Sequence, residues 1–209
     1  PVPIPPGLSQ SAVILSAHPD AKVDASLVRL LGKAVLPDAD GKPHQVIRYA
    51  HVTCELQASG GSQARCPIST QLVGVTNPLD LLKIEATPSE ITLRPGEKVE
   101  IKVRVVRNKS YTGPITLGLP FLYGNSIIND QLPPGVTMSA SSKARLTNNA
   151  VEGTVILEAA KGKGAPKPLK RFPIAVMGRI SMSFSISTNY ASNPIHLTIL
   201  DTSAKTAER

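Results

Sequence analysis

Hydrophobic and polar side chains alternate along much of this chain with a period of two residues. The clearest stretch runs from Arg171 to Thr188. Its even-numbered positions, from Phe172 to Ile186, are apolar except at Gly178, and the odd-numbered positions of its second half are mostly serine. A period of two places one set of side chains on a buried face and the other on a polar face, whereas helical spacing would scatter both sets. The pattern predicts a long β-strand that bends near Gly178.

Shorter alternating segments, separated by proline and glycine, cover most of the second half of the chain. The clearest of them is Val99–Arg107. Further strands are predicted at Ile91–Leu93, Leu82–Ala86, Pro114–Leu119, Gly135–Ser139, Gly153–Ala159 and Ile195–Leu200. No stretch of a dozen residues carries an apolar stripe at helical spacing. Short strands with frequent turn signals are typical of an all-β, antiparallel β-sandwich.

Part of the pattern occurs twice, which indicates an internal repeat. The aligned segments are Ser11–Ala17 with Gly153–Ala159 and Val28–Ala34 with Ile174–Ile180, and the loop between them is four residues longer in the second copy. Both copies then continue to a turn and another alternating strand. In the first copy these are Pro37–Pro43 and His44–Leu56. The first copy therefore contains only the second half of the repeated unit.

This repeat predicts the domain organisation. We expect residues 1–57 to form the C-terminal half of one repeat, 58–81 a linker or connecting strand, 82–200 a complete sandwich, and 201–209 a flexible tail. Half a sandwich leaves an apolar face uncovered, so we expect another chain or segment to complete it, in cis or in trans. The opening Pro-Val-Pro-Ile-Pro-Pro, without an initiator Met or a leader, indicates a processed or excised piece.

Three short motifs follow one another in the second copy: Gly113–Leu117, Leu132–Thr137 and Glu152–Leu157. In this order they resemble the immunoglobulin-like repeats of large planctomycete-type secreted and cell-envelope proteins, and Ile4–Val13 is similar to a strand entry of those repeats. Such repeats often accompany pre-peptidase C-terminal-type domains. The resemblance implies immunoglobulin-like sandwiches in an exported, multi-repeat scaffold, secreted, periplasmic or at the cell surface, and it brings no catalytic motif.

The chain has two cysteines, Cys54 and Cys66, on either side of a Gly-Gly pair that can reverse the chain. In an exported protein a disulfide between them would contribute about 2–3 kcal/mol by restricting the unfolded chain. Free thiols are one alternative. A metal site that includes His44 or His51 is another, but it would need more ligands close by. The structural disulfide is the favoured interpretation.

Charge is unevenly distributed. Lysine and arginine number 23 against 15 acidic residues, for a net charge of +8, and no acidic residue occurs between Ala159 and Leu200. The basic residues of the loop that opens this region are Lys161, Lys163, Lys167, Lys170 and Arg171. This loop can contact a polyanion such as an acidic polysaccharide, or it is a solvated hairpin that charge keeps soluble. With 3% aromatic residues and no tryptophan, we expect no specific nucleic-acid binding. No apolar run is long enough for a transmembrane segment.

No known catalytic or nucleotide-binding motif is present, and the four histidines are dispersed. Asp38–Gly41 is better explained as a hairpin turn than as a calcium loop. We therefore expect no enzyme activity, cofactor or metal. The favoured hypothesis is a non-catalytic structural or interaction module of an exported envelope protein, which associates with other chains or domains through sheet edges and loops. The alternative is a carbohydrate-binding module of a secreted enzyme.

Overall fold

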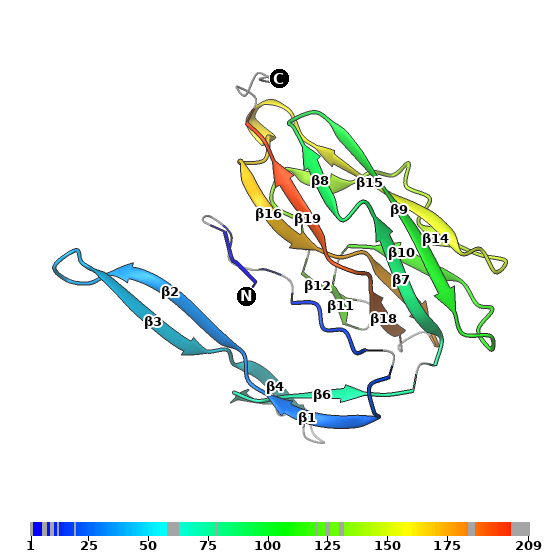
Figure 1. The fold of residues 1–209 in the computed structure, drawn as a ribbon, viewed down its shortest axis with the longest axis horizontal. Coiled ribbons are helices and arrows are strands. Elements are labelled where there is room, and N and C mark those ends of the chain that lie inside the picture. Colours follow the sequence, from blue (N-terminus) through cyan, green and yellow to red (C-terminus); the bar gives the residue numbers. More distant parts are fainter. Residues whose placement is uncertain are drawn as a thin grey trace. The chain divides into compact units, whose positions relative to one another are not determined.

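The computed structural model describes residues 2–5, 8, 11, 13–18, 20–57, 63–77, 79–119, 121–123, 126–129, 132–183 and 187–201. Its regular structure is β-strand throughout, apart from one short 3-10 helix at Gly162–Gly164 (Figure 1). The chain divides into two units. One comprises Pro1–Ser16 and Pro78–Arg209, and the other comprises Ala17–Asn77.

The first sheet of the larger unit contains four antiparallel strands in the order β13-β15-β9-β7. Their bounds are β7 Leu81–Thr87, β9 Lys98–Arg107, β13 Val136–Met138 and β15 Glu152–Ala159. Buried and exposed positions alternate strictly along the second half of β9, as the sequence pattern predicted. One face of this sheet therefore supplies core side chains and the other carries charged and polar ones.

The second layer, called the second sheet below, comprises two sheets, β14-β10-β17-β18 and β16-β19-β8, which one long hairpin connects. Its strands are β8 Glu90–Leu93, β10 Ile115–Gly118, β14 Arg145–Leu146, β16 Leu169–Ile174, β17 Met177–Ser181, β18 Ser187–Ala191 and β19 Ile195–Ile199. The ladders β16–β19 and β17–β18 are the two halves of the hairpin, and we call them together the buried ribbon. On its edges, β8 runs parallel to β19 and β10 runs antiparallel to β17. A further hairpin joins β11 Phe121–Tyr123 to β12 Ser126–Asn129.

These connections give the strand orders of an immunoglobulin fold. Across one sheet, β7, β9, β15 and β13 take the places of strands A, B, E and D. In the other layer, β10, β16–β17 and β18–β19 take those of C, F and G. The parallel pair β8–β19 adds the second part of strand A. The predicted all-β, immunoglobulin-like antiparallel sandwich is therefore confirmed for this unit.

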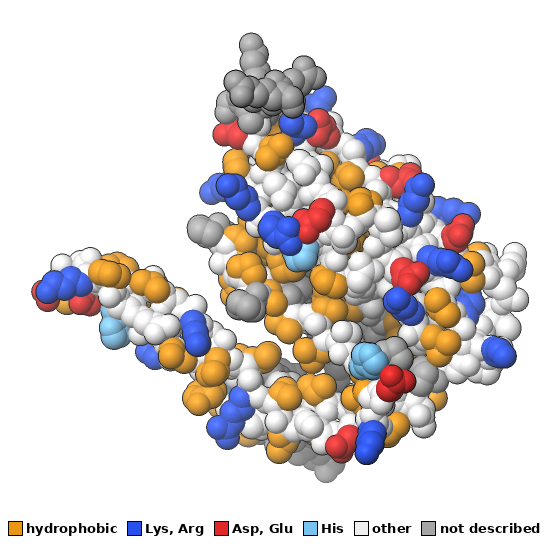
Figure 2. All heavy atoms as spheres, viewed as in Figure 1, with side chains coloured by type: hydrophobic (Ala, Val, Ile, Leu, Met, Phe, Trp, Pro, Cys, Tyr) orange, Lys and Arg blue, Asp and Glu red, His pale blue; other side chains and the backbone are white. Residues whose placement is uncertain are grey.

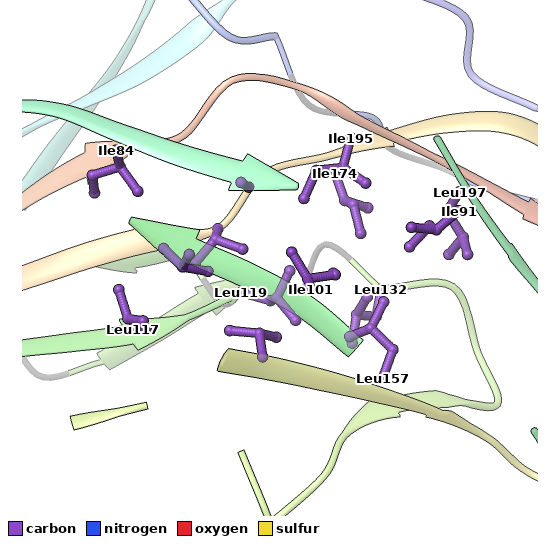
Figure 3. Packing of buried hydrophobic residues seen from close by; sticks show 14 of the residues in the cluster. Ile84, Ile91, Ile101, Leu117, Leu119, Leu132, Leu157, Ile174, Ile195 and Leu197 are labelled. Carbon is purple, nitrogen blue, oxygen red and sulfur yellow. The ribbon is translucent and has the colours of Figure 1, made fainter. Parts of the chain in front are cut away.

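Aliphatic side chains from both sheets fill the core between them (Figure 3). In the buried ribbon, Phe172, Ile174, Val176 and Ile180 are at most 2% exposed. The predicted single strand Arg171–Thr188 is wrong, because β16 ends at Ile174, β17 runs from Met177 to Ser181 and β18 begins at Ser187. The break at Ala175–Val176 lies shortly before Gly178, near the predicted bend. Gly178 gives close packing, because a Cβ there would lie 2.5 Å from Ile84 Cδ1. The predicted core position Met182 is 60% exposed, because β17 ends at Ser181.

The smaller unit, Ala17–Asn77, consists of three antiparallel two-stranded ladders, β1–β6, β2–β3 and β4–β5. Their bounds are β1 Asp24–Val28, β2 Leu31–Pro37, β3 Pro43–Tyr49, β4 Val52–Gln57, β5 Gln63–Ile68 and β6 Gln71–Val75. The backbone N–H of Ala50 donates to the Leu30 carbonyl at 2.9 Å, at the point where β1–β6 gives way to β2–β3. We call these two ladders together the open ribbon.

Several expected features of the first half differ from the structure. The predicted strand Ser11–Ala17 does not form over its described residues, because no neighbouring strand pairs with it there. The segment 58–81, expected to be a linker or a connecting strand, contains β5, β6 and the start of β7, and the units divide at residues 16–17 and 77–78. Leu8 packs against the core of the larger unit. The expected tail lies outside the described residues beyond Asp201.

Candidate interaction site

Exposed large apolar side chains lie opposite each other on neighbouring strands of the open ribbon. Leu27 on β1 lies directly opposite Leu72 on β6, and these side chains are 72% and 71% exposed. No described side chain between Ala17 and Asn77 belongs to the buried class. Figure 2 shows hydrophobic side chains along the visible face of β2 and β3. Clustered, exposed apolar side chains are typical of a surface that is covered by a partner.

One face of the β2–β3 ladder is mostly apolar. Leu31 lies opposite Tyr49 and Lys33 opposite Ile47, and Val35 follows on the same face. Leu31, Tyr49 and Ile47 are 52%, 51% and 46% exposed. The guanidinium of Arg29 lies 5.8 Å from the centre of the Tyr49 ring, which favours a cation–π contact.

Backbone groups at the edges of the open ribbon are also available. Among the described residues, β2 pairs only with β3, and β6 pairs only with β1. An edge strand presents a row of unpaired N–H and C=O groups, onto which another strand can add. The open ribbon therefore offers both main-chain hydrogen bonds and apolar side chains to a polypeptide.

The turn between β2 and β3 is the predicted hairpin turn. The Asp38 carboxylate accepts hydrogen bonds from the backbone N–H groups of Asp40 and Lys42, at 3.0 and 2.8 Å. Gly41 has a φ of 77°, a conformation that favours glycine. These hydrogen bonds fix the end of the hairpin locally, in the manner of an Asx turn.

The two cysteines lie directly opposite each other on β4 and β5. Facing residues of an antiparallel pair have Cα atoms about 4.5–5.5 Å apart, within the range that a disulfide spans. Cys66 is exposed and is a free cysteine in this structure. The antiparallel pairing expected on either side of the Gly-Gly pair is present, the pair itself lies outside the described residues, and the predicted disulfide stays a prediction.

The predicted basic loop, Lys161–Arg171, passes through the 3-10 helix after β15 and ends within β16, because Lys170 and Arg171 belong to that strand and not to a loop. Lys161, Lys163, Lys167 and Lys170 are all exposed. Arg171 differs, because its Nη1 lies 2.8 Å from Glu90 Oε1, which is also 3.3 Å from His196 Nδ1. The loop thus presents four of its five predicted cations freely to solvent, and Glu90 partly neutralises the fifth.

The alkyl part of Lys161 lies over Gly96 in the turn between β8 and β9, where a Cβ would collide with it. Gly96 has a φ of 84°, and its N–H donates to the Ala159 carbonyl at 2.9 Å. This packing anchors the first lysine of the basic loop at the end of the sandwich. A side chain at position 96 would displace it.

The outer face of the first sheet carries a hollow of about 670 Å³. Lys143 and residues of β7, β9 and β15 line it. The strand residues are Glu85, Thr87, Lys102, Val103, Arg104, Glu152, Gly153 and Thr154. Acidic and basic side chains face each other across the strands, with Arg104 opposite both Glu85 and Glu152. Lys83 lies 2.7 Å from Glu85 and lowers the pKa of that carboxyl through a hydrogen bond. The mixed charge favours no single class of ligand.

The tyrosines whose side chains the structure describes do not form an aromatic platform. The Tyr111 hydroxyl donates to the Pro114 carbonyl at 2.8 Å, and the Tyr190 hydroxyl donates to Asp80 Oδ2 at 3.1 Å. Partial burial raises the pKa of both. Both side chains thus support loops of the sandwich, while Tyr49 belongs to the open ribbon.

Sequence reasoning missed the polar junction that joins the two sheets of the sandwich. Asn193 exchanges two hydrogen bonds with the backbone of Ala86: its Oδ1 accepts from N–H at 2.8 Å and its Nδ2 donates to C=O at 3.1 Å. Beside it, Ser192 is 2% exposed and its Oγ accepts from the Val176 N–H at 3.0 Å. The Ser-Asn-Pro sequence does not indicate the distant partner.

In the part of the chain that the structure describes, no group of three or more His, Cys, Asp or Glu side chains could hold a metal ion. Over the same residues, no helix has the length and apolar character to cross a membrane.

No protein-family model matches this chain. No curated protein matches it either. Among solved structures, a chain from the structural study of T cell specificity and activation by the bacterial superantigen toxic shock syndrome toxin-1 is similar at 12% identity, over 56% of this chain and 98% of its own, with a TM-score of 0.32.

Two structures of an S-layer protein are similar to a comparable degree. The protein rSbsC(31-844) matches at 13% identity over 85% of this chain and 28% of its own, with a TM-score of 0.30. Domains 4 and 5 of the S-layer protein SbsC match at 13% identity over 85% of this chain and 100% of their own, with a TM-score of 0.29.

Proposed function

We propose that this chain is a non-catalytic structural and interaction module of an exported, multi-repeat cell-envelope protein. In this function the sandwich is a stable support, and the open ribbon joins the module to a neighbouring chain or domain. The resemblance of Gly113–Leu117, Leu132–Thr137 and Glu152–Leu157 to envelope repeats supports the location.

The exposed cross-strand pair Leu27 and Leu72 carries this proposal. Each side chain is more than 70% exposed although the two lie in direct register on one face. Removing apolar surface from water stabilises a complex by about 25 cal/mol per Å² before the cost of association. A partner that covers this face would thus gain affinity from both leucines.

Co-sedimentation with isolated cell envelope from the producing organism tests the proposal. We expect the wild-type chain to bind and the double variant L27S/L72S to stay in the supernatant. The matched control is Leu82→Ser, because Leu82 is a 53% exposed leucine on β7 of the sandwich. A wild-type chain that does not bind, or a double variant that binds equally well, would contradict the proposed function.

The basic loop supplies a second candidate contact, with acidic polysaccharide of the envelope. Replacing Lys161, Lys163, Lys167 and Lys170 by alanine separates this contribution from the apolar one. An electrostatic contact weakens with added salt and is lost in the quadruple variant, whereas an apolar contact is insensitive to both changes. Binding that depends on the lysines alone would place the attachment in the basic loop and not in the open ribbon.

The Cys54–Cys66 disulfide belongs to the same proposal, since an exported protein folds in an oxidising compartment. Non-reducing peptide mass spectrometry of the protein purified from that compartment should find the two cysteines linked. Free thiols in that material would remove this support for export.

A further inference from the structure

The open ribbon matches the pairing scheme of the buried ribbon position by position. When Gly32 is placed on Gly178 and Arg48 on Tyr190, all five pairs of β17–β18 fall on pairs of β2–β3. The first three pairs of β1–β6, starting from Val28, likewise fall on pairs of β16–β19. The match ends at the irregularity between Leu169 and Phe172 in β16.

The interruptions of the two ribbons also coincide. In the alignment that the sequence repeat defines, the break at Arg29–Leu30 falls on the break at Ala175–Val176. At that break the Ser192 N–H donates to the Val176 carbonyl at 2.9 Å, and the equivalent Ala50 N–H donates to the Leu30 carbonyl at the same distance. Beyond the break the ribbons differ, because Ser192–Pro194 leads directly into β19, whereas the hairpin β4–β5 stands between β3 and β6.

In the buried ribbon, an added strand and a facing sheet bury the apolar side chains. Strand β10 adds to the free edge of β17 with Leu117 opposite Gly178, and the facing sheet covers the inner side chains. Val176 is then fully buried, whereas its counterpart in the open ribbon, Leu30, is 43% exposed. The edge of β2 that corresponds to the β10 edge has no partner among the described residues.

We infer that Ala17–Asn77 is the F–G half of a second immunoglobulin-like domain, and that the edge of β2 at Leu31–Lys33 binds an antiparallel, C-type β-strand that is not already paired within a sandwich. This inference rests on the proposed function and names a partner for the β2 edge. The leucines Leu27 and Leu72 fall on Pro173 and His196 in the same alignment and so lie on the other face of the ribbon. The strand resembles Ile115–Gly118 in character, with alternating apolar side chains and one apolar residue opposite Gly32. Gly32 has no side chain and therefore leaves room for the apolar residue of the added strand. Gly178 in the buried ribbon likewise leaves room for Ile84.

A second copy of this chain does not supply the strand. Its own C-type strand, β10, already lies between β14 and β17, so both of its edges are occupied. Releasing β10 would expose the core side chains Ile115 and Leu117, which are 0% and 2% exposed. The donated strand is therefore one that is not already paired within a complete sandwich.

Titration of the isotope-labelled full chain with a synthetic peptide of residues 112–119, its own C-type strand, tests the inference. We expect chemical-shift changes and slower amide exchange at Leu31–Lys33 of the open ribbon. The signals of the sandwich should stay unchanged. A peptide carrying Leu117→Asp should bind at least about tenfold more weakly, because it replaces by a charge the apolar side chain that lies opposite Gly178 in the buried ribbon.

The variant Gly32→Glu on the chain provides the reciprocal change, and Gly74→Glu on β6 is its matched control. Loss of peptide binding in the first variant alone supports the inference, provided that cross-strand contacts between Leu31 and Tyr49 show an intact hairpin.

No chemical-shift change at Leu31–Lys33, or changes only in β6 or in Pro78–Arg209, would overturn the inference. Amide exchange in β2 that slows as the concentration of the chain rises, before peptide is added, would show that a second copy occupies this edge. That result would also overturn the inference. If the peptide fails while envelope binding still depends on Leu27 and Leu72, the proposed function stands and this partner does not.

Discussion

At Glu158 a lysine on the neighbouring strand controls the ionisation of an exposed carboxylate. Lys98 Nζ lies 2.6 Å from Glu158 Oε1 and, through this hydrogen bond, holds the pKa of Glu158 below its ordinary value of 4.5; a hydrogen bond from Ser139 adds to the effect. A carboxyl with a lowered pKa stabilises the fold above its unfolded-state pKa, and the contribution disappears as the pH falls through the folded-state pKa.

We predict that Lys98→Met raises the pKa of Glu158 toward its ordinary value and removes this contribution to acid stability. A pH titration of the carboxyl signals by NMR measures it directly. Lys83→Met is the matched control, because it should raise the pKa of Glu85 and leave that of Glu158 unchanged. Equal titration of Glu158 in the wild type and the Lys98 variant would refute the assignment.

Asn193 is the residue whose loss should affect the sandwich out of proportion to its size. Its amide replaces a strand partner for Ala86, so Asn193→Ala leaves a backbone donor and a backbone acceptor without partners. We predict a loss of about 1–3 kcal/mol in the free energy of unfolding, measured with urea. Asn193→Asp keeps the acceptor but not the donor, and it should also destabilise the fold. Wild-type stability in both variants would show that water replaces the amide at no cost.

Among the elements, leucines of the two ribbons should respond very differently to truncation. Leu197 on β19 is fully buried, so Leu197→Ala should cost about 2–5 kcal/mol of stability. Leu72 on β6 is 71% exposed, so Leu72→Ala in the chain alone should change stability by less than about 0.5 kcal/mol. Denaturant unfolding of both variants tests the contrast. A large loss for Leu72→Ala would mean that its face is already covered in solution.

The alternating sequence pattern located the strands of the sandwich because each of them buries one face in a single core. The pattern failed where burial of a segment depends on neighbouring strands or on contacts that are distant in the sequence. Ser11–Ala17 has the pattern of its counterpart β15 but not the adjacent strands that complete a ladder, so its described residues form no strand. The pattern also did not show that Arg171–Thr188 is divided into β16, β17 and the start of β18. At the break between β16 and β17 the Val176 N–H donates to Ser192 Oγ, a contact that lies far away in the sequence.

The candidate site was predictable to a similar extent. The Gly-Gly pair between Cys54 and Cys66 predicted antiparallel pairing of the flanking segments, and the structure has that pairing. The basic loop was predictable from composition, but Glu90, which neutralises Arg171, lies far away in the sequence. The open ribbon was expected from the incomplete repeat. Its register could not be predicted, since a shift by one residue exchanges the two faces and only the structure shows which pairs form.

For the whole molecule, the two units should differ in local stability. The sandwich encloses a core, whereas the ladders of Ala17–Asn77 are two-stranded and contain no buried side chain among their described residues. Two-stranded ladders are marginally stable in water, and amide protection depends on local stability. We predict that hydrogen exchange in the chain alone is fast in β1, β2, β3 and β6 and slow in β9 and β15. Exchange mass spectrometry compares them in one experiment, and the sandwich is its internal control. Addition of a true partner should slow exchange in the open ribbon only, while equal protection of both units without a partner would mean that the open ribbon is already complete.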